Sequence, residues 1–271
     1  MRKFIKIKSV AELAALKEKC VFLAGGTDIY VALNDGVFAD AVICDISALK
    51  GLDKIALKGK NISLGALTVF SDIVKSPLIK KHANCLAEAA ATVGSPQIRN
   101  RATIGGNAAN GSPSGDAIPA LYALGAVIKT NLRSVAVDKF FTGPKKTVLK
   151  KNEIITEIVI PVKNNTSFFE KIGRRKALAI SKVSAAVSLV ISGGVIREAG
   201  IAFGAVGPTV IRAAETEEFL KGKKLNEAVI SHASKTAAGE ICPIDDFRST
   251  AKYRLETAAV IISRILNGIK T

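Results

Sequence analysis

The chain has 271 residues, of which 48% are hydrophobic and 23% charged, so it can form a substantial core and is not disordered. Its 39 basic and 23 acidic residues give a net charge of +16, which indicates either an acidic partner or a solvated lysine-rich surface. The basic residues are scattered, tryptophan is absent and no nucleic-acid-binding motif occurs, so we expect an acidic protein and no nucleic acid. The longest apolar stretch, residues 183–195, is too short to span a bilayer, so no membrane partner is expected.

Residues 1–50 predict a small βαβ-like lobe. The sequence Ser9-Val10-Ala11-Glu12 has the form of a capping box, which predicts a helix over residues 10–19. Apolar runs predict strands at residues 4–7, 21–24 and 41–46. The positively charged N-terminus lacks the apolar segment of a signal peptide, so a cytoplasmic protein is expected.

Residues 51–163 predict a second lobe. Its centre is residues 94–115, a run rich in Gly, Asn, Ser and Pro that predicts a long functional loop. A hairpin is expected at residues 55–57 and 61–64, helices at 69–74, 84–93 and 116–124, and strands at 126–130, 134–137 and 153–160.

A linker at residues 161–165 precedes a smaller C-terminal unit. Strands are expected first, at residues 167–172, 185–191 and 199–206, and helices afterwards, at 213–221, 226–238 and 250–266. Strands followed by helices predict an α+β domain.

The four cysteines are far apart and form no CxxC pair, which argues against iron–sulfur and zinc sites. The expected state is a set of buried free thiols in a reducing compartment, for Cys20, Cys44, Cys85 and Cys242. Since the only histidines are His82 and His232, a histidine metal site is not expected either.

Two short glycine motifs are the most informative part of the sequence. Ala24-Gly25-Gly26-Thr27-Asp28 follows an apolar run, and Thr103-Ile104-Gly105-Gly106-Asn107 lies in the long polar segment. Paired glycines allow positive φ and let successive backbone N–H groups form an anion-binding concavity. Each motif alone could be a tight turn, but together they suggest one extended anionic ligand such as a diphosphate.

The familiar nucleotide-binding motifs are missing. No two of the 22 glycines are separated by a single residue, which excludes the G-x-G-x-x-G fingerprint of dinucleotide-binding Rossmann folds. The chain also lacks the P-loop sequence and the G-x-S-x-G of α/β-hydrolases. A dinucleotide would have to be bound by another architecture.

Polar residues around the second glycine motif suit such a ligand. Arg99 and Arg101 could place positive charge near a phosphate, and Asn107 and Asn110 could contact a ribose or cap a helix. Asp116 stands at a predicted helix start, where it is either an N-cap or a carboxylate that holds ribose hydroxyls.

These motifs resemble the FAD-binding medium subunits of the xanthine dehydrogenase and carbon monoxide dehydrogenase family of molybdenum hydroxylases. The similarity keeps the order and spacing of motifs along nearly the whole chain. It is carried by residues 21–28, 97–107, 112–121, 153–161, 171–175 and 246–254. A cysteine-rich insertion like that of the 4-hydroxybenzoyl-CoA reductase branch is absent from the sequence, which argues against that branch.

The resemblance implies an α+β fold with a two-lobed FAD-binding (PCMH-type) domain at residues 1–163, with lobes at about 1–50 and 51–163, and a small α+β C-terminal domain at 166–271. FAD would lie between the lobes, with its diphosphate on the two glycine motifs, Asp116 near the ribose and adenosine, and apolar side chains flanking the flavin. The implied cofactor-binding residues are Phe22, Leu23, Ala24, Gly25, Gly26, Thr27, Asp28, Ile29, Val93, Thr103, Ile104, Gly105, Gly106, Asn107, Asp116, Ile155 and Lys171.

The resemblance also implies an electron-transfer role in a heteromeric oxidoreductase. A molybdenum-cofactor large subunit would oxidise the substrate, and a [2Fe–2S] small subunit would pass electrons to this FAD for delivery to NAD or another acceptor. The metals would then belong to other subunits, and no catalytic or metal-binding residue is expected in this chain. Two alternatives stay open: a stand-alone FAD-dependent oxidoreductase, and a basic nucleic-acid-binding protein.

Overall fold

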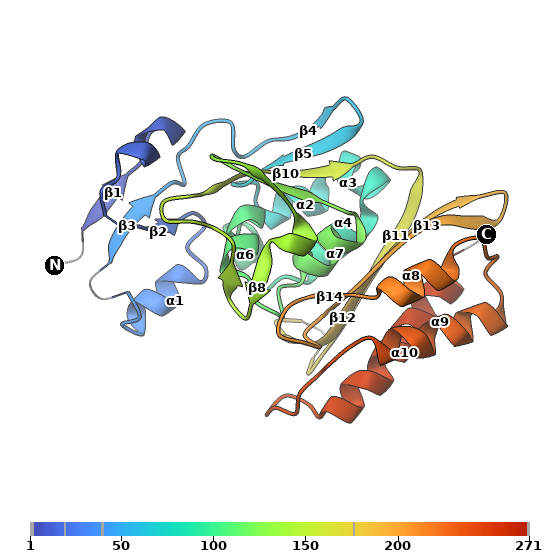
Figure 1. Cartoon of the computed structure of the whole chain (residues 1–271). Coiled ribbons are helices and arrows are strands. Elements are labelled where there is room, and N and C mark those ends of the chain that lie inside the picture. The colour runs from blue at the N-terminus through green and yellow to red at the C-terminus, as the bar shows by residue number, and fades with distance from the viewer. Residues whose placement is uncertain (1–2, 19, 39–40, 176, 270–271) are drawn as a thin grey trace.

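The computed structural model describes residues 3–18, 20–38, 41–175 and 177–269, and Figure 1 shows the chain from the N-terminal lobe to the C-terminal helices. Within these residues, helices and strands build the mixed architecture expected from the sequence. The predicted α+β fold is confirmed.

The N-terminal lobe is a parallel three-stranded sheet in the order β1 (Phe4–Lys6), β3 (Val42–Asp45) and β2 (Cys20–Leu23). A 3₁₀ helix, η1 (Val10–Ala15), connects β1 to β2, and α1 (Ile29–Asn34) connects β2 to β3. The βαβ-like prediction is therefore confirmed. The first glycine motif lies between β2 and α1, at the carboxyl end of its strand.

The helix predicted over residues 10–19 is wrong in type and length. The Glu12 carboxylate accepts hydrogen bonds from the Ser9 hydroxyl (3.3 Å) and the Lys8 amide (3.0 Å). The Ser9 side chain therefore does not cap the helix, which ends at Ala15. Lys19, the last residue of the predicted helix, lies outside the described residues.

An antiparallel sheet organises the second lobe, with the predicted hairpin at one edge. Its strands, in order across the sheet, are β4 (Ile55–Lys58), β5 (Asn61–Gly65), β10 (Ile155–Pro161), β6 (Val127–Thr130) and β7 (Ser134–Ala136). A short 3₁₀ helix and a two-stranded ribbon follow β7; they are η2 (Val137–Lys139), β8 (Phe141–Gly143) and β9 (Lys146–Thr147).

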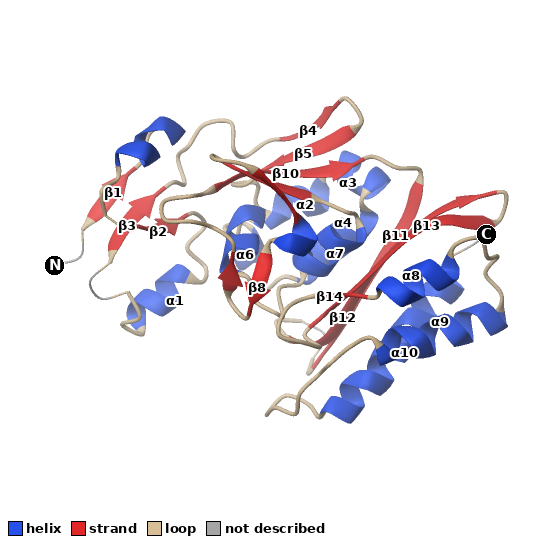
Figure 2. Cartoon of the chain, in the orientation of Figure 1, coloured by secondary structure: helices blue, strands red, loops and turns tan. Residues whose placement is uncertain are grey.

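Helices form a layer between this sheet and the C-terminal sheet (Figure 2). The largest core joins Ile62 and Ile158 of the second-lobe sheet, Leu86 and Leu121 of the helices, and Ala186 of the C-terminal sheet. The helices of this layer are α2 (Phe70–Lys75), α3 (Pro77–His82), α4 (Asn84–Thr92) and α7 (Ala117–Ala123). Small residues on α4 allow it to pack closely against the sheet.

The segment predicted as one long loop, residues 94–115, contains two short helices. In α5 (Pro96–Arg99), the Ser95 hydroxyl accepts from the Ile98 amide at 3.2 Å. In α6 (Ile104–Asn110), the Thr103 hydroxyl accepts from the Gly106 amide at 3.1 Å. The second glycine motif is therefore the N-terminus of a helix and not an extended loop.

The C-terminal unit follows the predicted order of strands and then helices. Its antiparallel sheet has α4 and α7 on one face and the terminal helices on the other (Figure 2). The strands are β11 (Asn165–Gly173), β12 (Ser181–Ser192), β13 (Val195–Gly204) and β14 (Ile211–Arg212), and the helices are α8 (Ala214–Leu220), α9 (Glu227–Gly239) and α10 (Ala251–Gly268). None of the helices in the described part of the chain combines the length and apolar character needed to cross a bilayer.

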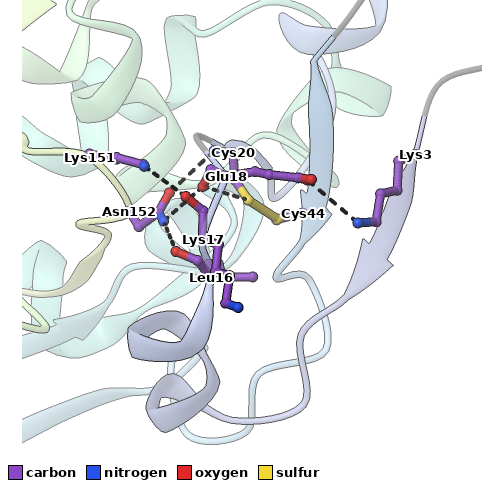
Figure 3. Close-up of a disulfide and its surroundings, with 8 residues drawn as sticks. All are labelled: Lys3, Leu16, Lys17, Glu18, Cys20, Cys44, Lys151 and Asn152. Atoms are coloured by element: carbon purple, nitrogen blue, oxygen red, sulfur yellow. Dashed lines mark hydrogen bonds and ion pairs between the residues drawn. A yellow bond between two sulfur atoms is a disulfide. The ribbon is translucent and has the colours of Figure 1, made fainter.

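The prediction of four buried free thiols is wrong for three of the cysteines. Cys20 and Cys44 form a disulfide between the neighbouring strands β2 and β3, with their Cα atoms 5.8 Å apart (Figure 3). Cys242 is free but exposed, and Cys85 alone is free and buried. The sequence did not indicate the disulfide, because its two cysteines lie on parallel strands that are separated along the chain by α1 and its loops.

Reduction of the Cys20–Cys44 bond should destabilise the N-terminal lobe by about 2–4 kcal/mol, because the bond constrains the unfolded chain between β2 and β3. Thermal unfolding with and without a dithiol reductant measures this effect in the Cys242→Ser variant, which lacks the exposed thiol. If unfolding of the unreduced variant exposes three reactive thiols instead of only Cys85, the pairing is contradicted.

The ion pairs of Glu157 with Lys58 and Lys129 on the second-lobe sheet predict that the stability of the fold depends on pH. Partial burial disfavours ionisation of Glu157, but hydrogen bonds from Lys58 (2.8 Å), Ser63 and Lys129 outweigh it and lower its pKa to about 2. Because the carboxyl pKa is lowered on folding, the ionised Glu157 stabilises the fold at pH values above 4.5, the ordinary pKa of the group. This contribution is lost as the pH falls towards about 2. Because both lysines are exposed, we expect a contribution of about 1–2 kcal/mol, measured by denaturant unfolding between pH 6 and pH 3. The Glu157→Gln variant should lose this part of the pH dependence, and an unchanged profile would contradict the assignment.

Candidate functional site

The first glycine motif leaves its backbone donors free. None of the described residues accepts a hydrogen bond from the amides of Gly25, Gly26, Thr27 or Asp28. Gly26 is buried with φ +81°, a backbone conformation that residues other than glycine rarely adopt. Successive free amides in this turn suit an anion without the help of a lysine.

The second glycine motif differs from the expectation, because its amides are already used within the protein. The Ile104 amide donates to the Thr68 carbonyl (3.0 Å), and the Gly105 amide donates to the Ala66 carbonyl (2.9 Å). The Gly106 amide donates to the Thr103 hydroxyl. The motif instead offers the Asn107 side chain, whose Oδ1 is buried and has no partner among the described residues. A buried acceptor without a donor is costly, so this atom suits a ligand that donates a hydrogen bond.

The first glycine motif lies against residues that flank the second, although the two are far apart in the sequence. A Cβ atom on Gly25 would overlap the carbonyl oxygen of Arg101 and lie 2.7 Å from its carbonyl carbon. The Asn110 amide donates to the Asp28 carboxylate at 3.2 Å. Gly25 is therefore required where its backbone approaches that of Arg101. The Asn110 side chain, for which a ribose contact or a helix cap was expected, instead joins the two lobes through Asp28.

A buried ion pair forms a second part of the site. Lys171 on β11 binds the Asp116 carboxylate, and the Ser181 hydroxyl donates to the same carboxylate at 2.6 Å. The Lys171 ammonium also donates to the Thr92 carbonyl at the end of α4 (3.3 Å). Burial raises the pKa of Asp116 above its ordinary value, and Lys171 and Ser181 oppose that effect. Asp116 occupies the N-cap position of α7, as one interpretation had it, but its side chain makes no capping hydrogen bond.

The two predicted apolar residues lie in different surroundings. Val93 follows Thr92 directly and is half-buried, with its carbonyl accepting from the Arg99 guanidinium at 3.0 Å. Arg99 therefore holds its own turn through hydrogen bonds to two carbonyls, and its expected position near a phosphate stays a prediction. Ile155 is buried in β10, next to the residue whose carbonyl accepts from the Ala66 amide (3.0 Å).

The structure thus gathers the predicted cofactor residues into two groups. The first unites the strand β2 and its glycine loop with the start of α6, and Ile155 adjoins it through Ala66; its members are Phe22, Leu23, Ala24, Gly25, Gly26, Thr27, Asp28, Ile29, Thr103, Ile104, Gly105, Gly106, Asn107 and Ile155. The second group is Asp116 with Lys171, and Val93 adjoins it through Thr92.

Two residues of this region had no sequence signal. Ser181 contacts Asp116 across 65 positions of the chain, and the turn at Ala66 supplies the carbonyl that fixes Gly105. Neither residue belongs to a motif, because each acts through a tertiary contact.

A separate cavity of about 220 Å³ lies between the end of α7 and the C-terminal sheet. Its lining includes Gly125, Lys163, Ser188 and Arg212, and none of the predicted cofactor residues. The free amides and the unpartnered Asn107 oxygen are therefore better guides to the ligand than this cavity.

Known families match both parts of the chain. Residues 1–163 match the family described as FAD binding domain in molybdopterin dehydrogenase. Residues 167–269 match the family described as CO dehydrogenase flavoprotein C-terminal domain. FAD is therefore the cofactor of the family to which this chain is similar.

Curated relatives and solved structures agree with these matches. The glyceraldehyde dehydrogenase medium chain of Sulfolobus acidocaldarius is 32% identical, over 91% of this chain and 89% of its own length. The nicotinate dehydrogenase FAD-subunit of Eubacterium barkeri is 31% identical, over 91% of this chain and 87% of its own length. A structure of carbon monoxide dehydrogenase from Hydrogenophaga pseudoflava matches with a TM-score of 0.92 and 31% identity, covering 98% of this chain and 96% of that chain. The chain belongs to the family of FAD-binding medium subunits of molybdenum-dependent dehydrogenases, and it is an oxidoreductase subunit.

Proposed function

We propose that this chain passes electrons through FAD within a heteromeric molybdenum hydroxylase. The observation that supports the proposal is its similarity, along both parts of the chain, to medium chains of dehydrogenases. Bound FAD supplies the redox chemistry, whereas the protein binds, orients and tunes it. The partners would be a molybdenum-cofactor large subunit and a [2Fe–2S] small subunit, and the acceptor NAD or another oxidant. We place this activity in the cytoplasm, where NAD is available.

We propose two tasks for the residues of the site. The free amides of Gly25 to Asp28 would bind the diphosphate, and the Asn107 side-chain oxygen would accept a hydrogen bond from the cofactor. Asp116 and Lys171 would hold its polar groups at the other end, and Val93 and Ile155 would exclude water from it. This division would assign residues 1–163 to FAD binding and residues 166–271 to a C-terminal domain whose β11 contributes Lys171.

The test uses the complex purified from its host through a tag on this chain, before and after removal of FAD. We expect near-stoichiometric flavin and, on anaerobic addition of NADH, bleaching of the flavin absorbance followed by reduction of the iron–sulfur centres. Without FAD, NADH should no longer reduce the iron–sulfur centres, and added FAD should restore the reaction. If NADH has no effect but ferricyanide reoxidises the dithionite-reduced flavin, the acceptor is one other than NAD. Turnover by the isolated chain without other subunits would contradict the electron-relay role and favour a stand-alone oxidoreductase.

A further inference from the structure

Large apolar side chains are exposed on two segments at one end of the C-terminal sheet. Phe247 is 76% exposed and Ile244 is 69% exposed in the segment before α10, and Ile180 is 55% exposed just before β12. Leu178 and Tyr253 are also exposed. We call these five residues the C-terminal apolar patch. Exposed apolar groups gathered in this way are typical of interaction sites, whereas single exposed residues need no explanation.

The two segments meet in the folded chain. The Lys182 ammonium lies 4.9 Å from the centre of the Tyr253 ring. Ile180 lies two positions before Lys182, directly before β12 begins at Ser181. In Figure 1 the segment before α10 and the start of β12 both lie at the lower end of the C-terminal unit.

A fixed turn, and not a loose loop, holds Phe247 outward. The Asp246 carboxylate accepts from the amides of Arg248 (2.8 Å) and Ser249 (3.1 Å). The buried Arg254 guanidinium binds the same carboxylate at 2.6 Å and the Ala205 carbonyl at 2.8 Å. The Arg248 guanidinium covers one face of the Phe247 ring, 4.1 Å from its centre. A buried arginine is thus used to present an exposed aromatic ring.

The second segment is also fixed by an arginine. The Arg175 guanidinium donates to the carbonyls of Ala177 (3.0 Å) and Leu178 (2.7 Å). Leu178 has φ +54°, an unfavourable conformation for a side chain of this size. Its exposure therefore depends on a defined turn, as does that of Phe247.

The patch lies close to the proposed cofactor site. Ser181 binds Asp116, while its neighbour Lys182 contacts Tyr253, because successive residues of a strand point to opposite faces. The Ala205 amide donates to the Pro113 carbonyl at 2.8 Å, which ties the Arg254 anchor to the segment before Asp116. A protein bound on the patch would therefore lie near one end of the cofactor.

Charge selects the kind of partner. The basic residues around the patch are Arg174, Arg175, Lys182, Arg248 and Lys252. Of the carboxylates between Ile244 and Arg248, Asp246 is bound by Arg254 and Arg248, and Asp245 is exposed and accepts from the Ala251 amide, so basic groups are in excess. A second copy of this chain would bring the same basic groups together, which is unfavourable. An apolar centre with a polar, charged rim is typical of protein–protein interfaces.

We propose that the C-terminal apolar patch docks an acidic surface of a partner redox subunit, with Phe247 as the apolar anchor and Arg248 and Lys252 as the contacts to carboxylates. This inference rests on the proposed function, and it adds to it the surface through which the chain enters its complex. Since exposed aromatic and arginine side chains dominate many interfaces, we expect Phe247 to contribute more than any other residue of the patch.

The test compares complexes purified from the host through a tag on this chain. Phe247→Glu should lower the amount of the other subunits recovered per chain at least tenfold, with unchanged flavin content of the chain. The double reversal Arg248→Glu with Lys252→Glu should give a similar loss. Leu132→Glu is the matched control, because Leu132 is 62% exposed in the turn between β6 and β7 and should leave assembly unchanged.

The outcomes separate this proposal from the proposed function. If the wild-type chain brings its partners and both variants bring as much, docking through the patch is wrong while the electron-transfer role stands. If the complex assembles and the variants lose it, but the flavin never exchanges electrons with the other subunits, the electron-transfer role is wrong and the docking surface stands. If the wild-type chain recovers no other subunit, both proposals fail.

Discussion

Replacing Lys171 by methionine should lower the free energy of unfolding by about 3–5 kcal/mol at pH 7.5 and abolish flavin binding. The substitution keeps most of the side-chain volume but leaves the buried Asp116 carboxylate without its cation. Only the Ser181 hydroxyl would remain as a strong donor to that carboxylate. Denaturant unfolding and the flavin absorbance per chain measure the two effects.

The pH dependence of this variant identifies the cause. Burial already raises the pKa of Asp116, and loss of the Lys171 ammonium should raise it further. A carboxyl whose pKa is raised on folding destabilises the fold above that pKa, so the deficit should shrink as the pH falls. The double variant Lys171→Met with Asp116→Leu should regain much of the stability, because no charge is then buried. A pH-independent deficit that the second substitution does not relieve would show that the pair is not responsible.

Gly25→Ala should destabilise the protein by about 2–3 kcal/mol, because the added methyl group overlaps the backbone at Arg101 and no side chain can move aside to admit it. The lobes can accommodate the methyl group only by separating, so the first glycine loop should move away from α6 and flavin affinity should fall as well. Thermal unfolding and flavin titration measure both effects.

Gly239→Ala is the matched control for Gly25→Ala. Gly239 ends α9, and an added Cβ would meet no atom within 4 Å. Alanine favours helix over glycine, so this variant should be as stable as the wild type or slightly more stable. Equal stability of the Gly25 and Gly239 variants would contradict the close approach of Gly25 to the Arg101 backbone.

The elements that could be predicted are those with local signals. Alternating and apolar runs predicted the hairpin of β4 and β5 and the long strands and helices of the C-terminal unit, because one face of each is buried. The helix α1 was missed, because a glycine turn dominates the sequence before it. The helices α5 and α6 were missed because glycine and proline were interpreted as loop signals, although Ser95 and Thr103 cap both helices.

Motifs indicated the segments of the candidate site but not the contacts within it. The glycine pairs indicated two segments of backbone, but only tertiary contacts decide that the first keeps its amides free and the second uses them. Arg99 and Cys20 show the same limit. The Arg99 guanidinium donates to the nearby Val93 carbonyl, and Cys20 is bonded to Cys44 on a strand that is distant in the sequence. Family resemblance placed Lys171 and Asp116 separately at the cofactor, but neither the resemblance nor the residues alone predicted that they pair.

The flavin content of Gly106→Leu tests the central claim most directly. An added Cβ on Gly106 would lie 2.8 Å from the Thr103 hydroxyl, so that side chain must shift, and it would stand at the start of α6, on the side of the site proposed to hold the cofactor. We predict that purified Gly106→Leu retains its helical circular dichroism and holds less than about a tenth of the wild-type flavin, whereas Gly239→Leu keeps a full complement. A folded Gly106→Leu variant with stoichiometric FAD would contradict binding of the cofactor between the two glycine motifs.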